Sequence, residues 1–200
     1  MKFHLTFFSS LLIGLLLLSG QAFAVTYYSR PGAGLLWLAT GTWSNISCAS
    51  AGTGGIPNAT DELIICSGTT VTVGAVSVGL NATVKTGGTL DLSTHVLTLS
   101  GALTNDGGTI DGDGAQAFVA QSIVHNGGIT NLMGVTTNSA HAVTVTAAPL
   151  GLTLPTGLIL IDGLFTSGVN FTMPGSVANL IGGIAVTGGT LTLNAQQFSI

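Results

Sequence analysis

The sequence predicts an all-β protein, a right-handed parallel β-helix in which coils of about 20 residues stack into a solenoid. Three observations predict it: a Gly-Gly turn returns at a fixed interval, short β-branched runs lie between the turns, and charged residues make up only 5% of 200 residues. A typical soluble domain has about 25% charged residues. Stacked coils explain the low value, because their residues point either into an apolar interior or outward into flat sheets of Thr, Ser and Asn.

A glycine triplet sets the repeat. Gly87-Gly88-Thr89, Gly107-Gly108-Thr109 and Gly127-Gly128-Ile129 follow one another at a constant interval. Ser67-Gly68-Thr69 lies one such period earlier, and Gly188-Gly189-Thr190 follows the third triplet after three periods plus one residue. A period of about 20 residues without helical patterning suits one coil of a parallel β-helix.

Short runs with the period of two typical of strands lie between these turns, at 70–73, 96–99, 143–146 and 158–161. A β-sandwich also has short strands, but it gives no reason for the same dipeptide to return at a fixed interval. A leucine-rich repeat has a similar period, but its leucine pattern is missing. We therefore expect β-helix repeats over 67–200. Because the last coil stops at Ile200 without a cap, we expect the repeats to be truncated at the C-terminus of a longer protein.

Residues 1–24 have the pattern of a signal peptide. Lys2 supplies the positive start, and 11–18 is a short apolar run. Ala22-Phe23-Ala24 has a small residue at its first and third positions, as signal cleavage sites do. The run is too short for the roughly 20 residues of a membrane-spanning helix. We expect cleavage after Ala24, and no transmembrane segment after signal cleavage.

Residues 25–66 differ from the repeats because they contain both Trp, both Tyr and both Cys residues of the chain. The first coil of a β-helix is exposed to water and to edge pairing, so we predict that this segment is an N-terminal cap. Cys48 and Cys66 form an even pair in an exported chain, which predicts a disulfide. A metal pair would need further Cys or His residues nearby, and there are none.

The aromatic residues of the cap are the first candidate ligand-binding site. If they are exposed, their rings offer a stacking surface for sugars; the alternative is that they seal the first coil. The residues are Tyr27, Tyr28, Trp37 and Trp43.

A carboxylate column is the second candidate. Asp91 and Asp111 are one period apart, so they stack on adjacent coils at about 5 Å, with Asn131 continuing the column. Asp113 lies on the same face as Asp111. Such a cluster would suit Ca²⁺, or a glycosidase pair, whereas the plainer alternative is a solvated turn. We expect no other cofactor.

The histidines suggest no site. His95, His125 and His141 occupy different places in their coils and match no zinc motif, so we expect them at the surface. Three Lys and Arg residues and a net charge of -4 leave no basic surface for phosphates, so nucleic acid is not an expected partner.

The start of the exported part resembles the N-terminal region of MshQ-like proteins of mannose-sensitive haemagglutinin pili, and more loosely the G8 domain of β-helical surface proteins. The resemblance is carried by Tyr27-Tyr28-Ser29-Arg30, Gly41-Thr42-Trp43-Ser44, Cys48, Pro57, Asp61, Ile64-Ile65-Cys66, Gly68 and Thr70-Val71-Thr72-Val73. It implies an extracytoplasmic, surface or pilus-related role in a Gram-negative bacterium, and it brings no catalytic residues.

The sequence therefore predicts a non-enzymatic structural or adhesive surface module. It would act as a stiff stalk whose Thr- and Asn-rich faces contact a cell-surface protein or glycan. The alternative is a carbohydrate-active β-helix enzyme or lectin that uses Asp91, Asp111 and Asp113.

Overall fold

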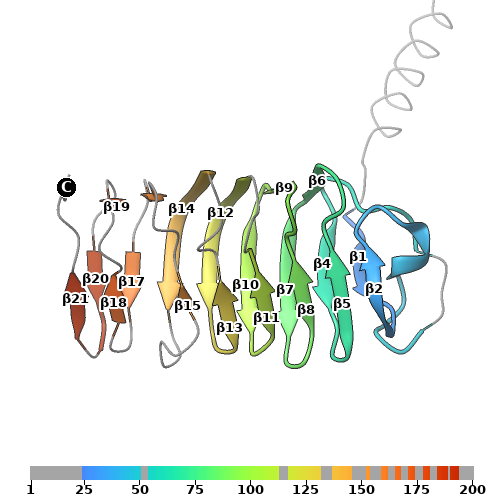
Figure 1. Cartoon of the computed structure of the whole chain (residues 1–200), viewed down its shortest axis with the longest axis horizontal. Coiled ribbons are helices and arrows are strands. Elements are labelled where there is room, and N and C mark those ends of the chain that lie inside the picture. Colours follow the sequence, from blue (N-terminus) through green and yellow to red (C-terminus); the bar gives the residue numbers. More distant parts are fainter. Residues whose placement is uncertain are drawn as a thin grey trace, which may run out of the picture.

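The computed structural model shows parallel strands stacked along one long axis (Figure 1). It describes residues 24–50, 54–112, 117–131, 137–145, 152–153, 159–161, 165–167, 171–173, 178–180, 184–188 and 190–193. The predicted parallel β-helix is confirmed. Of the predicted signal peptide, only Ala24 is described, and the predicted C-terminal truncation concerns residues beyond 193, outside the described part.

Each coil places short strands on three successive faces of the stack, called here the first, second and third, and the chain enters the stack on the second face. The first face contains β6 (Ser77–Gly79), β9 (Val96–Leu99), β16 (Ile159–Ile161) and β19 (Ala178–Leu180). The second face contains β1 (Thr26–Ser29), β4 (Glu62–Ile65), β7 (Asn81–Lys85), β10 (Ala102–Asp106), β17 (Phe165–Ser167) and β20 (Ile184–Val186). The third face contains β2 (Gly32–Leu36), β5 (Thr69–Thr72), β8 (Thr89–Asp91), β11 (Thr109–Asp111), β13 (Ile129–Asn131) and β15 (Leu152–Thr153). In a separate sheet, β18 (Phe171–Met173) pairs with β21 (Leu191–Leu193).

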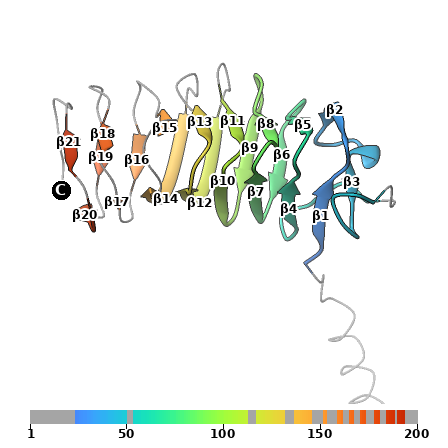
Figure 2. The same cartoon turned by 90° about the horizontal axis from the view of Figure 1, so that it is seen from below.

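Two longer strands join the first and second faces. The first residues of β12 (Ala117–His125) pair with β9 and its last residues pair with β10. Its neighbour β14 (Thr137–Val145) pairs along β12 and then with both β16 and β17. The two faces therefore merge into one sheet at these coils, which lie near the middle of the stack (Figure 2).

Strand register reproduces the predicted period. Asp111 pairs with Asp91 on one side and with Asn131 on the other, a step of one predicted period each way. The step is one residue shorter from Ile64 to Thr83, and it is two residues longer from Val143 to Phe165. Coil length therefore varies by one or two residues while the order of the faces is kept.

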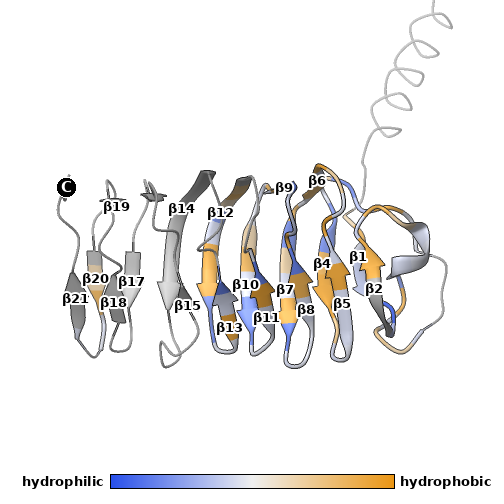
Figure 3. Ribbon diagram, in the orientation of Figure 1, coloured by the Kyte–Doolittle hydropathy of each residue, from blue (hydrophilic) through white to orange (hydrophobic). Residues whose placement is uncertain are grey.

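The interior follows from the alternation of residues along each strand, and apolar and polar residues share single strands (Figure 3). One inward column on the second face is buried in four consecutive coils and consists of Leu63, Ala82, Leu103 and Ile123. Another, on the third face, consists of Val71, Leu90 and Ile110. Each buried Leu or Ile contributes about 2 kcal/mol of transfer free energy, so these columns hold neighbouring coils together.

The repeated glycines form the corner between the second and third faces. Gly87 and Gly107 have φ values of +77° and +92°, a left-handed region that glycine adopts without steric cost. The second glycine of each pair lies against the preceding coil. A Cβ on Gly88 would lie 2.8 Å from the carbonyl oxygen of Cys66, and one on Gly108 would lie 2.5 Å from that of Lys85. The Gly-Gly repeat thus reflects both a turn and a close approach between coils.

The first coil begins earlier than the sequence predicts. Strand β1 pairs in parallel with β4, and β2 pairs in parallel with β5, so both belong to the stack. Between β2 and β4 the chain leaves the stack and forms a 3-10 helix, η1 (Thr40–Thr42), and β3 (Trp43–Ser44), which pairs antiparallel with β1. The boundary predicted at residue 66 falls inside the second coil. The cap is therefore this insertion, formed by the described residues between β2 and β4, rather than all of 25–66.

Candidate functional site

The Trp residues of the cap are both buried. Trp37 and Trp43 are 0% exposed, and their rings meet edge to face with centroids 5.5 Å apart. The indole Nε1 of Trp43 donates a hydrogen bond to the backbone oxygen of Trp37 at 2.7 Å. The two rings therefore close the end of the core and present no face to a sugar, whereas Tyr27 and Tyr28 are half-buried.

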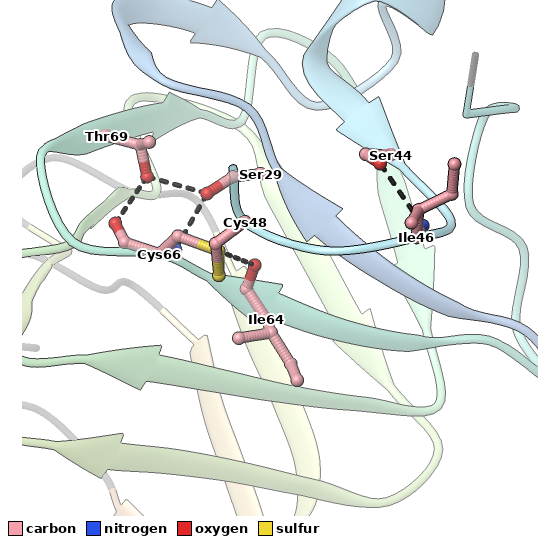
Figure 4. The surroundings of a disulfide bond; sticks show 7 residues. All are labelled: Ser29, Ser44, Ile46, Cys48, Ile64, Cys66 and Thr69. Carbon is pink, nitrogen blue, oxygen red and sulfur yellow. Dashed lines mark hydrogen bonds between the residues drawn. A yellow bond between two sulfur atoms is a disulfide. The ribbon is translucent and has the colours of Figure 1, made fainter. Parts of the chain in front are cut away.

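The predicted disulfide is present. Cys48 in the insertion is bonded to Cys66 at the corner between β4 and β5, with the two Cα atoms 5.7 Å apart (Figure 4). Ser29 in β1 accepts a hydrogen bond from the Cys66 amide at 2.7 Å and contacts the Thr69 hydroxyl at 2.6 Å, and Thr69 in turn donates to the Cys66 oxygen at 2.6 Å. The disulfide thus joins the cap to a buried polar network that links the first two coils.

Replacing both Cys48 and Cys66 by serine is expected to lower the free energy of unfolding by about 3 kcal/mol, because the bond closes a loop with a sequence separation of 18. Urea denaturation followed by circular dichroism measures this change. The oxidised wild type is the reference, and the reduced wild type should match the double variant. Equal midpoints for oxidised and reduced protein would contradict the expectation.

The carboxylate column lies where the sequence predicts it, on the third face. Asp91 in β8 pairs with Asp111 in β11, and Asn131 in β13 follows. One oxygen of Asp91 accepts from the Ser93 amide at 2.7 Å, and the other accepts from the Thr72 hydroxyl at 3.2 Å. Asp91 therefore stabilises its own turn and the preceding coil.

Asp111 is exposed on this face, so its carboxylate is accessible to solvent. Asp113 lies outside the described residues, so the predicted cluster of three carboxylates is seen only as an adjacent pair. Among the residues with described placement, no group of three or more His, Cys, Asp or Glu side chains is arranged to hold a metal ion.

A buried polar cluster lies in the interior. His125 is 0% exposed, so the expectation that the histidines lie at the surface is wrong for this residue. Its Nδ1 lies 3.0 Å from the hydroxyl of Thr130. Asn105, one coil earlier in the same inward column, donates to that hydroxyl at 2.8 Å and accepts from the Gly108 amide at 2.8 Å. His95 is half-buried, and the side chain of His141 lies outside the described part.

Strand register, rather than the glycine spacing, reveals this cluster. Asn105 pairs with the buried Val84 of the preceding coil, and Val84 pairs with the buried Ile65. Counting two residues back from the glycine pairs instead aligns Asn105 and His125 with the exposed Lys85. Each occupies a corner where backbone groups need partners, which is why polar residues replace aliphatic ones there.

Burial lowers the pKa of His125 below the usual value of 6.5, because an imidazolium loses its hydration in the interior. As the pH falls, the His125 side chain is therefore protonated more readily in the unfolded chain than in the folded chain. We expect the free energy of unfolding to decrease as the pH falls below 6.5. Urea titrations from pH 7.5 to pH 5 measure this dependence. His125→Asn should weaken it and His95→Asn should leave it in place; an unchanged slope in His125→Asn would contradict the assignment.

An apolar cleft of about 250 Å³ lies beside the cap, lined by Leu36, Leu38, Ala39, Gly74 and Ala75. Leu36 is 52% exposed, and the neighbouring Val76 is 67% exposed. None of the lining side chains carries a polar atom. The cleft therefore offers no side-chain acid, base or nucleophile.

These observations define the class of the molecule: a parallel β-helix closed at one end by a disulfide-tied insertion, with an in-register Asp pair on its third face. Comparison of the chain with protein-family models, curated proteins and solved structures finds no match. No helix within the described ranges has the length and apolar character needed to cross a membrane.

Proposed function

We propose that the protein is an exported structural or adhesive module of the periplasm or outer surface of a Gram-negative bacterium, associated with a pilus. The observation that carries this proposal is the continuous parallel pairing of the second face, from β1 through β20. Each coil is hydrogen-bonded to the next along the whole described stack, which makes a stiff spacer. The disulfide supports the extracytoplasmic part of the proposal, since such bonds persist in oxidising compartments.

The outward columns are the proposed contact surface. On the third face, Thr70, Thr89 and Thr109 are consecutive partners and half-buried. On the second face, Thr83 and Thr104 are paired in the same way. Hydroxyls then recur at the strand spacing of about 4.8 Å along a flat surface, an arrangement that supports contact with a glycan or an extended partner protein.

A second candidate is a carbohydrate-binding or carbohydrate-cleaving β-helix. The pairing of Asp91 with Asp111 favours it, because strand partners on adjacent coils are about 4.8 Å apart, near the carboxyl separation of roughly 5 Å in retaining glycosidases. In this alternative, the exposed Asp111 would act on the sugar, and Asp91, held by Thr72 and Ser93, would be the fixed partner.

The experiment is a glycan-array screen of oxidised protein comprising residues 25–200, with far-UV circular dichroism to establish β-structure. Selective binding that survives in the Asp91→Asn, Asp111→Asn, Asp113→Asn triple variant would support adhesion through the hydroxyl columns and contradict the carboxylate mechanism. Loss of binding in this variant would favour the second candidate. Absence of binding by a folded sample would contradict glycan adhesion, and the structural role as a stiff stalk would remain.

A further inference from the structure

The carboxylate of Asp61 is buried at the start of β4. The Asp61 residue is 1% exposed. Its Oδ2 accepts a hydrogen bond from the amide of Asn58 at 2.9 Å, and its Oδ1 accepts one from the backbone nitrogen of Val25 at 3.1 Å. Asp61 is also the acidic residue of the Pro57-x-x-x-Asp61 pattern in the segment that resembles surface proteins, and nothing in the proposed function uses it.

No positive charge within the described residues offsets this buried carboxylate. The only ion pair described joins Lys85 to Asp106, with Nζ and Oδ2 2.7 Å apart. Arg30 donates instead to the backbone oxygen of Gly41 at 3.1 Å. A buried carboxylate without a cation is costly, because amide donors replace only part of its hydration.

We infer that Asp61 is the binding site for the α-ammonium group that signal cleavage creates at Val25. Cleavage after Ala24 turns the nitrogen that already lies 3.1 Å from Asp61 Oδ1 into a cation. The neutral amide contact then becomes an ion pair between the residue before β1 and the residue before β4. This inference rests on the export and processing included in the proposed function.

The surroundings of Val25 fit this role. Its carbonyl oxygen accepts a hydrogen bond from the amide of Glu62 at 2.9 Å, so Asp61 and the first residue of β4 hold both backbone polar groups of Val25. The backbone oxygen of Asp61 accepts from the amide of Leu80 in the next coil at 2.8 Å. Strand β1 begins at Thr26, directly after Val25, and Ala24 is exposed. The predicted cleavage bond thus separates the exposed Ala24 from Val25, the first residue that is hydrogen-bonded to the stack.

The test uses the full chain, exported by a bacterial host and recovered after processing. A second form carries Gly-Ser inserted between Ala24 and Val25, which keeps the residues before the cleavage bond and moves the new ammonium two residues away from Asp61. Asp61→Asn is introduced into both forms. Mass spectrometry establishes each N-terminus, and urea denaturation gives the four unfolding equilibrium constants.

We expect Asp61→Asn to raise the unfolding equilibrium constant about tenfold more in the chain that begins at Val25 than in the Gly-Ser form. The reason is that a charge-assisted hydrogen bond is about twice as strong as a neutral one. Equal effects in the two forms would overturn the inference. Glu62→Gln is the matched control, since this neighbouring carboxylate is exposed and should show no such coupling.

Amine labelling gives an independent readout if Asp61→Asn does not fold. After cleavage the chain has two amines, the α-amine of Val25 and Lys85, because Lys2 leaves with the signal peptide. We expect the α-amine, relative to Lys85, to react with an acylating reagent about tenfold more slowly when it is at Val25 than in the Gly-Ser form. Equal rates would overturn the inference. An N-terminus other than Val25 would instead contradict the processing step of the proposed function, so the two failures are distinct.

Discussion

Replacing Gly108 by alanine is expected to lower the free energy of unfolding by about 2–3 kcal/mol, a large loss for the addition of one methyl group. The new Cβ would lie 2.5 Å from the Lys85 oxygen, 2.6 Å from Cγ1 of Val84 and 2.8 Å from the Gly88 oxygen. Two of these three neighbours are backbone atoms of earlier coils, so they cannot move without separating the stack. Urea denaturation of the oxidised protein measures the loss.

Gly41→Ala is the matched control for this substitution. A Cβ at Gly41 would meet nothing within 4 Å, and this residue belongs to η1 in the cap. We expect its effect to stay within about 0.5 kcal/mol. A Gly108→Ala variant as stable as Gly41→Ala would show that neighbouring coils are further apart at this corner than described.

Trp43→Ala is expected to cost about 3–5 kcal/mol, the usual range for removing a fully buried Trp. The substitution removes the edge-to-face contact with Trp37 and the hydrogen bond from Nε1 to the Trp37 oxygen at 2.7 Å. It also opens the end of the core to water. Thermal and urea unfolding report the loss, and Ile46→Ala, at a cap residue that is 66% exposed, should change stability little.

A finer comparison separates packing from hydrogen bonding in the same pair. The Nε1 of Trp37 is buried and has no hydrogen-bond partner among the described residues, whereas that of Trp43 is bonded. Trp43→Phe should therefore cost about 1 kcal/mol more than Trp37→Phe. Equal costs would mean that the Trp43 hydrogen bond contributes nothing net to folding.

The repeated part of the fold is predictable from sequence because one geometric requirement recurs there. Gly87 and Gly107 mark the same corner, and counting from them places Asp91 beside Asp111. The disulfide was predictable for a similar reason, since Cys48 and Cys66 had no other partner in the chain.

The N-terminal end was less predictable because its first coil lacks the repeat. Strand β1 pairs with β4 across an insertion, so Tyr28 lies opposite Ile64 rather than opposite a residue one period away. The corner between β1 and β2 consists of Arg30 and Pro31 instead of a glycine pair. The burial of His125 does not follow from residue type, because it depends on the inward place of this residue in its coil.

The role of Asp61 depends on contacts that no local pattern contains. Its partners are Asn58, three residues away, and Val25, which is 36 residues earlier. A sequence motif shows that an acidic residue follows a proline by four positions, but it does not show that its carboxylate is buried or which nitrogen it faces.

Strand register also determines how far along the chain each coil must reach for its partner. The first pairing, Tyr28 with Ile64, closes the long interval across the cap. After β4, each strand pairs with one that lies only about one repeat period earlier, from Ile64 with Thr83 to Val143 with Phe165. Each of these later pairings therefore closes a short interval at a small cost in loop closure. In a linear stack of such pairings, folding can begin at any of the later coils and spread to its neighbours, and the wide first coil is the costliest one to add.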